Sequence, residues 1–425
     1  METITFTPPG HRFHAAVAVP GDKSLSHRAL LLAAMAKGTS RIRGVAAGGD
    51  VLSMLGALDL LGVGFETDHV VSPGVEGWRN PGGPIDLGNS GTALRILTGA
   101  LGGHRDRITL TGDASLSSRP MRRLVEPLRA LGISVEVSPE GTPPVVTGAG
   151  RLHGADVEIP LASAQVRTAF AAAALQAEGP SAIDSPGGFR DHTERWLSAL
   201  GLGRWTSRTR FEILPGRVPP GYYEIPGDPS SAAFLWASAA LSPGSSVTTP
   251  GVSLNPGRIG FLDILEGMGA KVERRVVRMD LGEPIGDVTV IGGALRGAHV
   301  GGDLAIRTID ELPLVAVCAG IAEGETRVTG AADLRAKETD RIAAVVDMLG
   351  DLGAEAETAP DGFIVAGGAR YRGGRTESRG DHRIAMAAAV AATAADGPVT
   401  VAGFEAVAVS WPGFEQALEA AWSSR

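Results

Sequence analysis

Charged and hydroxyl side chains gather in short polar turns, each followed by an Ala- and Leu-rich stretch that predicts a helix. These turns carry Lys23, Ser24, Arg28, Asn89, Ser90, Gly91, Thr92, Ser163, Gln165, Asp310, Glu311, Asp381, His382 and Arg383. A helix N-terminus presents unpaired N–H groups and the positive end of the helix dipole, which favour phosphate or carboxylate. Capping explains a single Ser, Asp or Asn there, but cations at the same end oppose the dipole and indicate an anionic ligand.

Two further segments, 118–123 and 337–341, place several charges where a second helix is expected to begin. Arg119 is one of three arginines in the first segment. In the second, Lys337 and Arg341 would share one face of a helix, while Glu338 would turn aside. A solvated salt-bridge face is the alternative, but the combination with the polar turns favours a site.

Lysine is scarce in this chain. Only four lysines, at positions 23, 37, 271 and 337, stand against 35 arginines. Arginine has therefore been used wherever either cation would serve, and the lysines in the two charged regions above are expected to be needed as lysines.

The elements that position these residues repeat along the chain. Helical patterns ending in Leu-Gly or Met-Gly precede short strands at Gly62, Gly132, Gly201, Gly269 and Gly353, with spacings of 70, 69, 68 and 84 residues. The Ala-rich helices are apolar nearly all round, which predicts burial, and fall within 21–38, 88–103, 162–179, 227–244, 309–324 and 379–397. Each second helix, such as 124–132 or 341–353, is amphipathic and should cover a sheet. The chain thus contains six strand-helix-strand-helix-strand units.

Three such units make a domain of roughly 200 residues, so the sequence predicts an α/β protein of two similar domains. Proline and glycine are dense in 217–231, between the third and fourth units. Because residues 3–19 precede the first polar turn, we expect their strands to pair with the C-terminal half. The first domain is then expected to comprise 1–20 plus 227–425 and the second 21–226, with the site in the cleft between them.

Composition excludes several classes of protein. A single cysteine cannot form an internal disulfide, which indicates a reducing compartment. The N-terminal segment has no basic flank before an apolar core, and no stretch approaches about 18 uninterrupted apolar residues, so neither export nor membrane insertion is expected. The net charge of −8 argues against a nucleic-acid partner. We expect a cytoplasmic monomer.

Seven segments, in chain order and spread over most of the chain, read GDKSLSHRALLLAA, LGNSGTALRIL, SRPMRRLVEPLRALG, ASAQVRTA, GDPSSAAF, AKETDRIAAVVDMLGDLGAE and GDHRIAMA. Together they resemble the 5-enolpyruvylshikimate-3-phosphate synthase family of enolpyruvyl transferases. The resemblance implies two domains, each of three βαβαββ repeats around buried parallel helices. It also implies the substrates shikimate 3-phosphate and phosphoenolpyruvate, with enolpyruvylshikimate 3-phosphate and phosphate as products.

Matching motifs imply which residues hold each substrate. Shikimate 3-phosphate would contact Lys23, Ser24, Arg28, Ser163, Gln165, Arg190, Asp310 and Lys337. Phosphoenolpyruvate would contact Lys23, Gly91, Arg119, Gln165, Arg341 and Arg383. Planar arginine forks suit phosphate and carboxylate, and Gly91 lets the backbone approach the ligand.

The implied reaction needs a base for the sugar hydroxyl and an acid for the methylene carbon of phosphoenolpyruvate. We assign Asp310 as the base and Glu338 as the acid, with Lys23 neutralising charge in the transition state. Because Lys337 and Arg341 favour the charged form of Glu338, its protonation needs burial or bound substrate. No metal or organic cofactor is expected, since no His or Cys cluster has metal-ligand spacing.

The sequence departs from the family pattern at two positions. Ala164 replaces the second serine of an S-S-Q motif, and Val409 stands where a lysine often precedes an aromatic-Pro pair, so one contact to phosphoenolpyruvate is in doubt. The motifs SAQVR, RDHTE, GDPSS and NPGR resemble a divergent branch of the family, in which the first and last usually read SAQxK and NxTR. Within RDHTE, residues 191–194 are expected to serve only as a helix start.

Two alternatives compete with this interpretation. The related UDP-N-acetylglucosamine enolpyruvyl transferases share the fold and typically use a loop cysteine, whereas Cys318 lies in an apolar helix where a buried thiol is expected. A phosphometabolite-binding protein without turnover is the other alternative. Asp310, Glu338 and Lys23 argue against it, because binding alone requires neither an acid nor a base.

Overall fold

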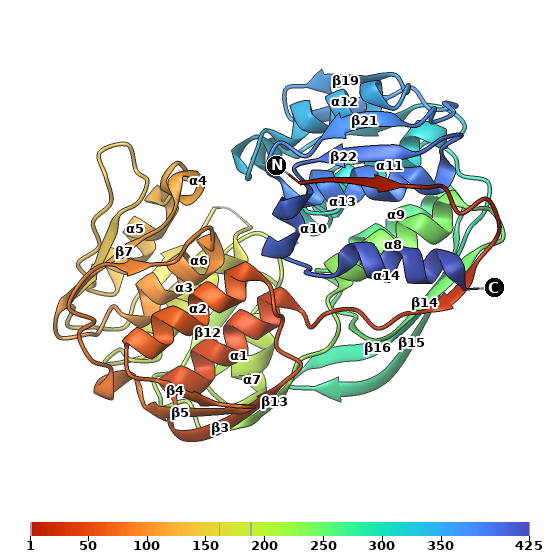
Figure 1. Cartoon of the computed structure of the whole chain (residues 1–425). Coiled ribbons are helices and arrows are strands. Elements are labelled where there is room, and N and C mark those ends of the chain that lie inside the picture. The colour runs from red at the N-terminus through yellow and green to blue at the C-terminus, as the bar shows by residue number, and fades with distance from the viewer. Residues whose placement is uncertain (1, 161, 188, 425) are drawn as a thin grey trace. The chain divides into compact units, whose positions relative to one another are not determined.

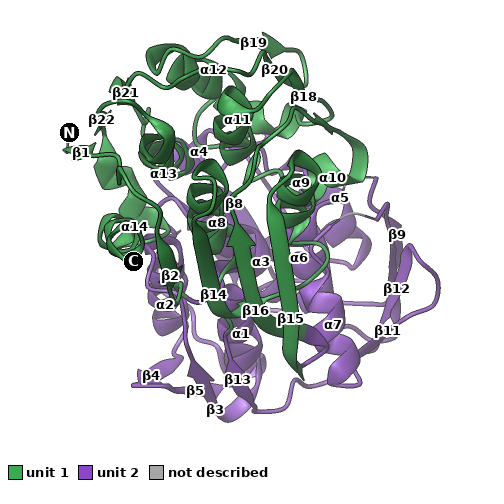
Figure 2. Ribbon diagram, turned by 90° about the vertical axis from the view of Figure 1, so that its right-hand side faces the viewer, with its two compact units in different colours: residues 1–20, 226–279, 284–425 green, residues 21–225, 280–283 purple. Residues whose placement is uncertain are grey.

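A computed structural model describes residues 2–160, 162–187 and 189–424. The chain forms two compact units (Figures 1 and 2). Unit 1 comprises residues 1–20, 226–279 and 284–425, and unit 2 comprises 21–225 and 280–283. The segment 280–283 therefore falls in unit 2, whereas the sequence analysis assigned it to the first domain.

Unit 2 contains three mixed sheets among its described residues. Their strands are β3 (Lys37–Arg43), β4 (Gly64–Glu66), β5 (His69–Pro73), β6 (Ile85–Asp86), β7 (Arg107–Thr111), β8 (Val145–Gly148), β9 (Asp156–Glu158), β10 (Ser181–Asp184), β11 (Gly203–Trp205), β12 (Arg210–Ile213) and β13 (Tyr222–Glu224). The strand orders are β13-β3-β5-β4, β6-β7-β8 and β11-β12-β10-β9. Each sheet has one parallel pair, β13 with β3, β6 with β7 and β9 with β10.

Three buried helices form the centre of unit 2: α1 (Lys23–Met35), α3 (Gly91–Ala100) and α6 (Ala164–Ala174). The remaining helices are α2 (Gly49–Leu60), α4 (Ala114–Ser117), α5 (Arg122–Ala130), α7 (His192–Ala199) and the 3-10 turn η1 (Val75–Gly77). Because the central helices are apolar nearly all round, they can be covered on every side, and a single apolar core surrounds them.

Helices α3 and α6 pack backbone against backbone at Gly99. A Cβ placed there would lie 1.9 Å from the carbonyl oxygen of Ala169. We expect Gly99→Ala to lower the free energy of unfolding by about 1–3 kcal/mol, because the two helices must move apart. In the control Gly56→Ala, on α2, the new Cβ meets no atom within 4 Å. That variant should be stabilised by roughly 0.5–1 kcal/mol in urea unfolding. Equal midpoints for the two variants would contradict the close approach.

Unit 1 also contains three mixed sheets among its described residues. Their strands are β1 (Thr3–Phe6), β2 (His14–Ala16), β14 (Ser246–Ser253), β15 (Lys271–Asp280), β16 (Glu283–Ile291), β17 (His299–Val300), β18 (Thr326–Val328), β19 (Ala356–Ala359), β20 (Gly362–Val365), β21 (Gly374–Glu377) and β22 (Val399–Ala402). The orders are β15-β16-β14-β2, β17-β18-β20-β19 and β1-β22-β21. As expected for residues 3–19, β1 pairs with β22 and β2 with β14 (Figure 2). The strand that pairs in parallel with β3 is instead β13.

The buried helices of unit 1 are α8 (Pro229–Leu241), α11 (Leu312–Ile321) and α13 (His382–Ala391). Its other helices are α9 (Gly260–Met268), α10 (Gly302–Arg307), α12 (Arg341–Asp351), α14 (Phe414–Ser423) and the 3-10 turns η2 (Ala332–Ala336), η3 (Ala392–Ala394) and η4 (Phe404–Val409). All six Ala-rich segments are thus helical, as predicted.

Helices α5 and α12 begin within the two charged segments, at Arg122 and Arg341, but three of the predicted site residues precede them. Arg119 lies between α4 and α5, outside both helices, because it precedes Pro120 and a residue before proline disfavours the helical conformation. Lys337 and Glu338 precede α12, which begins only at Arg341. Asp340 caps that helix by accepting hydrogen bonds from the backbone N–H groups of the next turn. Lys337 and Arg341 therefore do not share a helical face.

Candidate active site

Three helix starts in unit 2 carry predicted residues. Lys23 is the first residue of α1, whose cap Asp22 accepts from the backbone N–H of Leu25 at 2.8 Å. Ser90 caps α3, and Ser163 caps α6 through the backbone N–H of Val166 at 3.5 Å. Each predicted turn therefore presents the N-terminal end of a buried helix, where N–H groups favour an anion.

Lys23 forms an ion pair that the sequence analysis missed. Its Nζ lies 2.8 Å from Oδ2 of Asp50 at the start of α2. A quarter of the Lys23 side chain is exposed, so the ammonium group remains accessible to a ligand. The signal for Asp50 was its place after two glycines at a helix start, a position that favours an acidic residue.

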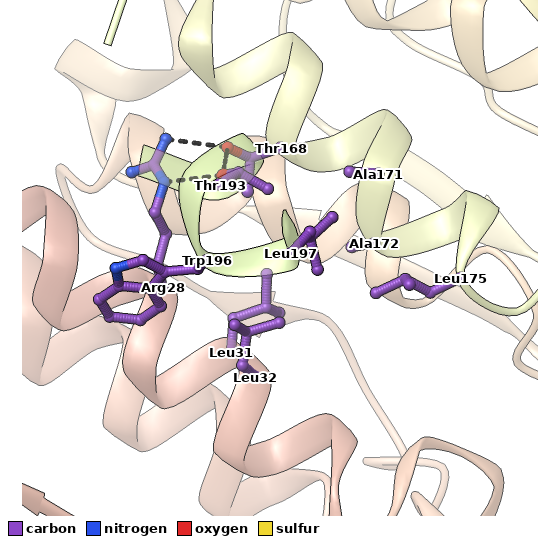
Figure 3. A pocket seen from close by; sticks show the side chains of 10 residues that line it. All are labelled: Arg28, Leu31, Leu32, Thr168, Ala171, Ala172, Leu175, Thr193, Trp196 and Leu197. Carbon is purple, nitrogen blue, oxygen red and sulfur yellow. Dashed lines mark hydrogen bonds between the residues drawn. The ribbon is translucent and has the colours of Figure 1, made fainter. Parts of the chain in front are cut away.

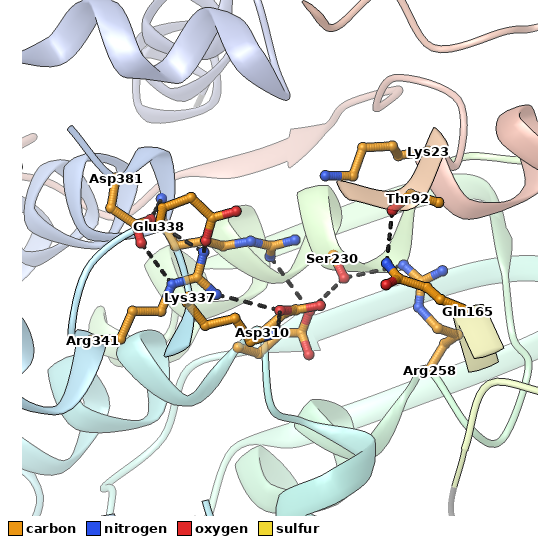
Figure 4. Close-up of polar contacts among 12 residues, drawn as sticks. Lys23, Thr92, Gln165, Ser230, Arg258, Asp310, Lys337, Glu338, Arg341 and Asp381 are labelled. Atoms are coloured by element: carbon orange, nitrogen blue, oxygen red, sulfur yellow. Dashed lines mark hydrogen bonds and ion pairs between the residues drawn. The ribbon is translucent and has the colours of Figure 1, made fainter. Parts of the chain in front are cut away.

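Gly91, Arg119 and Gln165 come together around Arg95, which the sequence analysis also missed. A Cβ at Gly91 would lie 2.9 Å from Nη1 of Arg95 and 3.5 Å from Nη1 of Arg119. Arg95 Nη1 donates to Oε1 of Gln165 at 2.6 Å. Gln165 Nε2 in turn donates to Oγ1 of Thr92 at 2.8 Å (Figure 4). Gly91 is thus needed for the close approach of two guanidinium groups. A lone arginine inside an apolar helix was the available signal for Arg95.

Arg190 lies in the connection between β10 and α7. The expectation that residues 191–194 form only a helix start is wrong, because side chains of this turn point into the unit. His192 Nδ1 lies 2.6 Å from Oε1 of Glu283, and both residues are buried. Glu194 pairs with the buried guanidinium of Arg167 at 2.5 Å. Buried charges require such partners, which lie far away in sequence.

In unit 1, the guanidinium group of Arg341 organises a cluster of carboxylates (Figure 4). Its Nε lies 2.7 Å from Oδ2 of Asp381, its Nη2 lies 2.7 Å from Oε2 of Glu338, and its Nη1 lies 3.3 Å from Oδ1 of Asp310. The same oxygen of Asp310 accepts from Nζ of Lys337 at 3.1 Å. The predicted base Asp310 and the predicted acid Glu338 therefore share one cation, Arg341. Glu338 reaches Arg341, and Lys337 reaches Asp310, from the loop before α12.

Burial of Arg341 by itself would lower the pKa of its guanidinium, but the charges of Asp381, Glu338 and Asp310 more than reverse this effect. The pKa of Arg341 is raised above its ordinary value, so the residue is a permanent cation. Because 2% of its side chain is exposed, its charge acts on the neighbouring carboxylates with little screening by water.

Arg383 lies beside a second buried carboxylate. Its Nη1 is 3.5 Å from Oε1 of Glu311, which also accepts a hydrogen bond from the hydroxyl of Ser230. The backbone N–H of Arg383 donates to Asp381, which caps α13. Glu311 and Asp381 thus hold the start of α13 and its cation in place. Val409 ends η4 and contributes no charge.

Two kinds of feature are absent from residues 2–160, 162–187 and 189–424. Among these residues no group of three or more His, Cys, Asp and Glu side chains could hold a metal ion. Within the same ranges, no helix is both long and apolar enough to cross a membrane.

The chain is similar to known proteins over nearly its whole length. The family model described as "EPSP synthase (3-phosphoshikimate 1-carboxyvinyltransferase)" matches residues 8–418. A 3-phosphoshikimate 1-carboxyvinyltransferase from Herpetosiphon aurantiacus is 46% identical over 414 residues, covering 95% of this chain and 96% of the relative. One from Roseiflexus sp. is 45% identical over 424 residues, covering 97% and 98%.

Solved structures show the same fold. The EPSP synthase from Acinetobacter baumannii matches with a TM-score of 0.87 and 38% identity, covering 99% of this chain and 98% of that one. The enolpyruvyl transferase NikO from Streptomyces tendae matches with a TM-score of 0.78 at 18% identity, which shows the fold alone. The expected α/β enolpyruvyl transferase fold is therefore confirmed. The chain belongs to the EPSP synthase (3-phosphoshikimate 1-carboxyvinyltransferase) family of enzymes.

Proposed function

We propose that this protein transfers the enolpyruvyl group of phosphoenolpyruvate to the 5-hydroxyl of shikimate 3-phosphate and releases phosphate. This reaction is a step of the shikimate pathway toward the aromatic amino acids. The observation that carries the proposal is the arrangement of Asp310 and Glu338 on one buried cation, Arg341, with Lys337 beside Asp310. A base and an acid are what addition of a hydroxyl across a carbon–carbon double bond requires.

In the first step, Asp310 accepts the proton of the 5-hydroxyl as its oxygen bonds to C2 of phosphoenolpyruvate. Glu338 gives a proton to C3, so a tetrahedral adduct forms. In the second step, the bond from C2 to the phosphate oxygen breaks and its electron pair leaves with the phosphate. The Glu338 carboxylate takes a proton back from C3, which restores the double bond, and the proton on Asp310 passes to the departing phosphate. Lys23 stabilises the negative charge that moves onto the departing phosphate.

We assign the substrate contacts as the family motifs imply. Shikimate 3-phosphate contacts Lys23, Ser24, Arg28, Ser163, Gln165, Arg190, Asp310 and Lys337. Phosphoenolpyruvate contacts Lys23, Gly91, Arg119, Gln165, Arg341 and Arg383. In this proposal, residues of both units serve the same pair of substrates. The two phosphates and one carboxylate of the substrates account for the number of cations at the helix starts.

The decisive experiment measures phosphate release from phosphoenolpyruvate with shikimate 3-phosphate as acceptor, and separately with UDP-N-acetylglucosamine. Turnover with the first acceptor alone supports the proposal. Turnover with the second would assign the related transferase activity. Binding of shikimate 3-phosphate without any phosphate release would indicate a binding protein. We also propose that the protein is a cytoplasmic monomer. Light scattering with and without both substrates measures its molar mass and so tests the monomeric state.

Replacement of Cys318 by serine separates the proposed function from a cysteine-dependent transferase. Cys318 is fully buried in α11, and burial raises the pKa of its thiol to about 12. A buried neutral thiol does not act as a nucleophile or an acid near pH 7. We therefore expect kcat of Cys318→Ser within about twofold of the wild type, with some loss of thermal stability from burial of a hydroxyl. Loss of turnover in a folded variant would favour the cysteine-dependent alternative.

A further inference from the structure

Arg28 lies on the second turn of α1, and the residue is 3% exposed. Three hydrogen bonds hold it, and Figure 3 shows the two that it makes to threonine hydroxyl groups. Nε donates to Oγ1 of Thr193 at 2.8 Å, Nη2 donates to Oγ1 of Thr168 at 2.8 Å, and Nη1 donates to the carbonyl oxygen of Ser24 at 3.0 Å. The two threonines come from different helices, α6 and α7, and both are buried.

The protons of the two hydroxyl groups can be assigned by counting donors. Thr168 Oγ1 donates to the carbonyl oxygen of Ala164 at 2.7 Å, which commits its only proton. The Thr168 and Thr193 hydroxyl oxygens lie 2.7 Å apart, so Thr193 must donate in that bond. Each hydroxyl is then oriented as an acceptor toward Arg28. The hydroxyl pair is therefore matched to a guanidinium group at this position.

The surroundings of Arg28 make these bonds decisive for its orientation. A small cavity lies beside it, and away from the hydroxyl pair the lining is apolar, with Leu31, Ala172 and Leu197 among its residues (Figure 3). A side chain next to a cavity has fewer packing contacts that fix its rotamer. The acceptors in the three bonds are two hydroxyl oxygens and one carbonyl oxygen, which fix the plane of the guanidinium group.

We propose that Thr168 and Thr193 are positioning residues that fix the Arg28 guanidinium for shikimate 3-phosphate. This inference rests on the proposed function. The threonines act through Arg28, so they are expected to affect binding of the sugar phosphate and leave phosphoenolpyruvate binding nearly unchanged. Thr193 lies within residues 191–194, which the sequence analysis expected to serve only as the start of a helix.

The test begins with Thr193→Val and Thr168→Val, which keep the side-chain shape and remove the hydroxyl. Each is expected to raise KM for shikimate 3-phosphate about tenfold, the size of one lost hydrogen bond to a charged group. The KM for phosphoenolpyruvate should change by less than about twofold. Thr193→Ser, which restores the hydroxyl, should return KM for shikimate 3-phosphate to within about threefold of the wild type.

Thr98→Val is the matched control. Thr98 is a buried threonine on α3 whose hydroxyl donates to the carbonyl oxygen of Leu94 at 2.7 Å. It has the same intrahelical bond as Thr168 and a different location. Thr98→Val should change neither KM by more than about twofold. If Thr193→Val and Thr168→Val resemble it, the inference is wrong.

A double-mutant cycle separates positioning of Arg28 from general packing. A lysine at position 28 has no Nε–H group that could donate to the Thr193 hydroxyl. In an Arg28→Lys background, Thr193→Val should therefore have almost no further effect on KM for shikimate 3-phosphate. Independent effects of the two changes on KM for shikimate 3-phosphate would overturn the inference. If one variant folds poorly, titration calorimetry with shikimate 3-phosphate still measures binding by the folded fraction, so the cycle can be completed. Absence of turnover in the wild type would instead contradict the proposed function.

Discussion

Replacement of Asp310 by asparagine is expected to lower kcat about a hundredfold to ten-thousandfold, which is the usual contribution of a general base. The change removes the ability to accept a proton but keeps the shape of the side chain. Asparagine Oδ1 can still accept from Lys337 and Arg341, so the cluster should remain assembled. Steady-state kinetics with both substrates, together with thermal unfolding, measure the two effects separately.

Asp333→Asn provides the control for this experiment. Asp333 lies on η2 in the same unit and is exposed. Asp333→Asn makes the same change of charge without altering the carboxylates around Arg341, and we expect its kcat to lie within about twofold of the wild type. Equal activity of Asp310→Asn and Asp333→Asn would exclude Asp310 as the base.

Replacement of Lys23 by methionine is expected to lower kcat about a hundredfold to a thousandfold, as for loss of one group that stabilises charge in a transition state. A second effect adds to this one. The carboxylate of Asp50, now 2.8 Å from the lysine, would lose this cationic partner and repel the phosphate groups of the substrates. Both KM values should therefore rise as well. Kinetics at constant ionic strength measure the combined change.

Two further variants are needed to interpret the result for Lys23→Met. Lys271→Met removes another of the four lysines from the exposed strand β15, where it pairs with Glu273, and should leave kcat unchanged. Asp50→Asn in the Lys23→Met protein should recover substrate binding but not kcat, because it removes the repulsion without restoring the cation. Recovery of kcat by that double variant would mean that Lys23 only neutralises Asp50.

The repeating elements could be predicted because they depend on local patterns. An Ala-rich stretch without a polar face must be buried, and the six predicted stretches are the helices around which both units form. The polar turns were also correctly located, since a capping side chain precedes α1, α3, α6, α8 and α13. The pairing of residues 3–19 with the C-terminal half followed from their position before the first turn.

The contacts that complete the candidate site could not be predicted in the same way. Asp50 meets Lys23 across 27 residues, and Glu194 meets Arg167 across 27 residues, although neither pair shares an element. Lys337 was assigned to a helix because its spacing to Arg341 fits one, but Asp340 ends the loop and begins the helix. Local periodicity contains no information about such partners, which depend on how the helices pack.

The pairing of β1 and β2 with strands of the C-terminal half has a consequence for synthesis on the ribosome. Apart from residues 280–283, unit 2 is complete once β13 has been made, so its sheets can form while the rest of the chain is still being translated. Unit 1 has the opposite property. Thr3 pairs with Ala402, and the backbone N–H of His14 donates to the carbonyl oxygen of Ser424 at 3.1 Å. Closing a loop of this length is slow, so β1 must wait for β22 before it is paired, whereas β2 can pair earlier with β14.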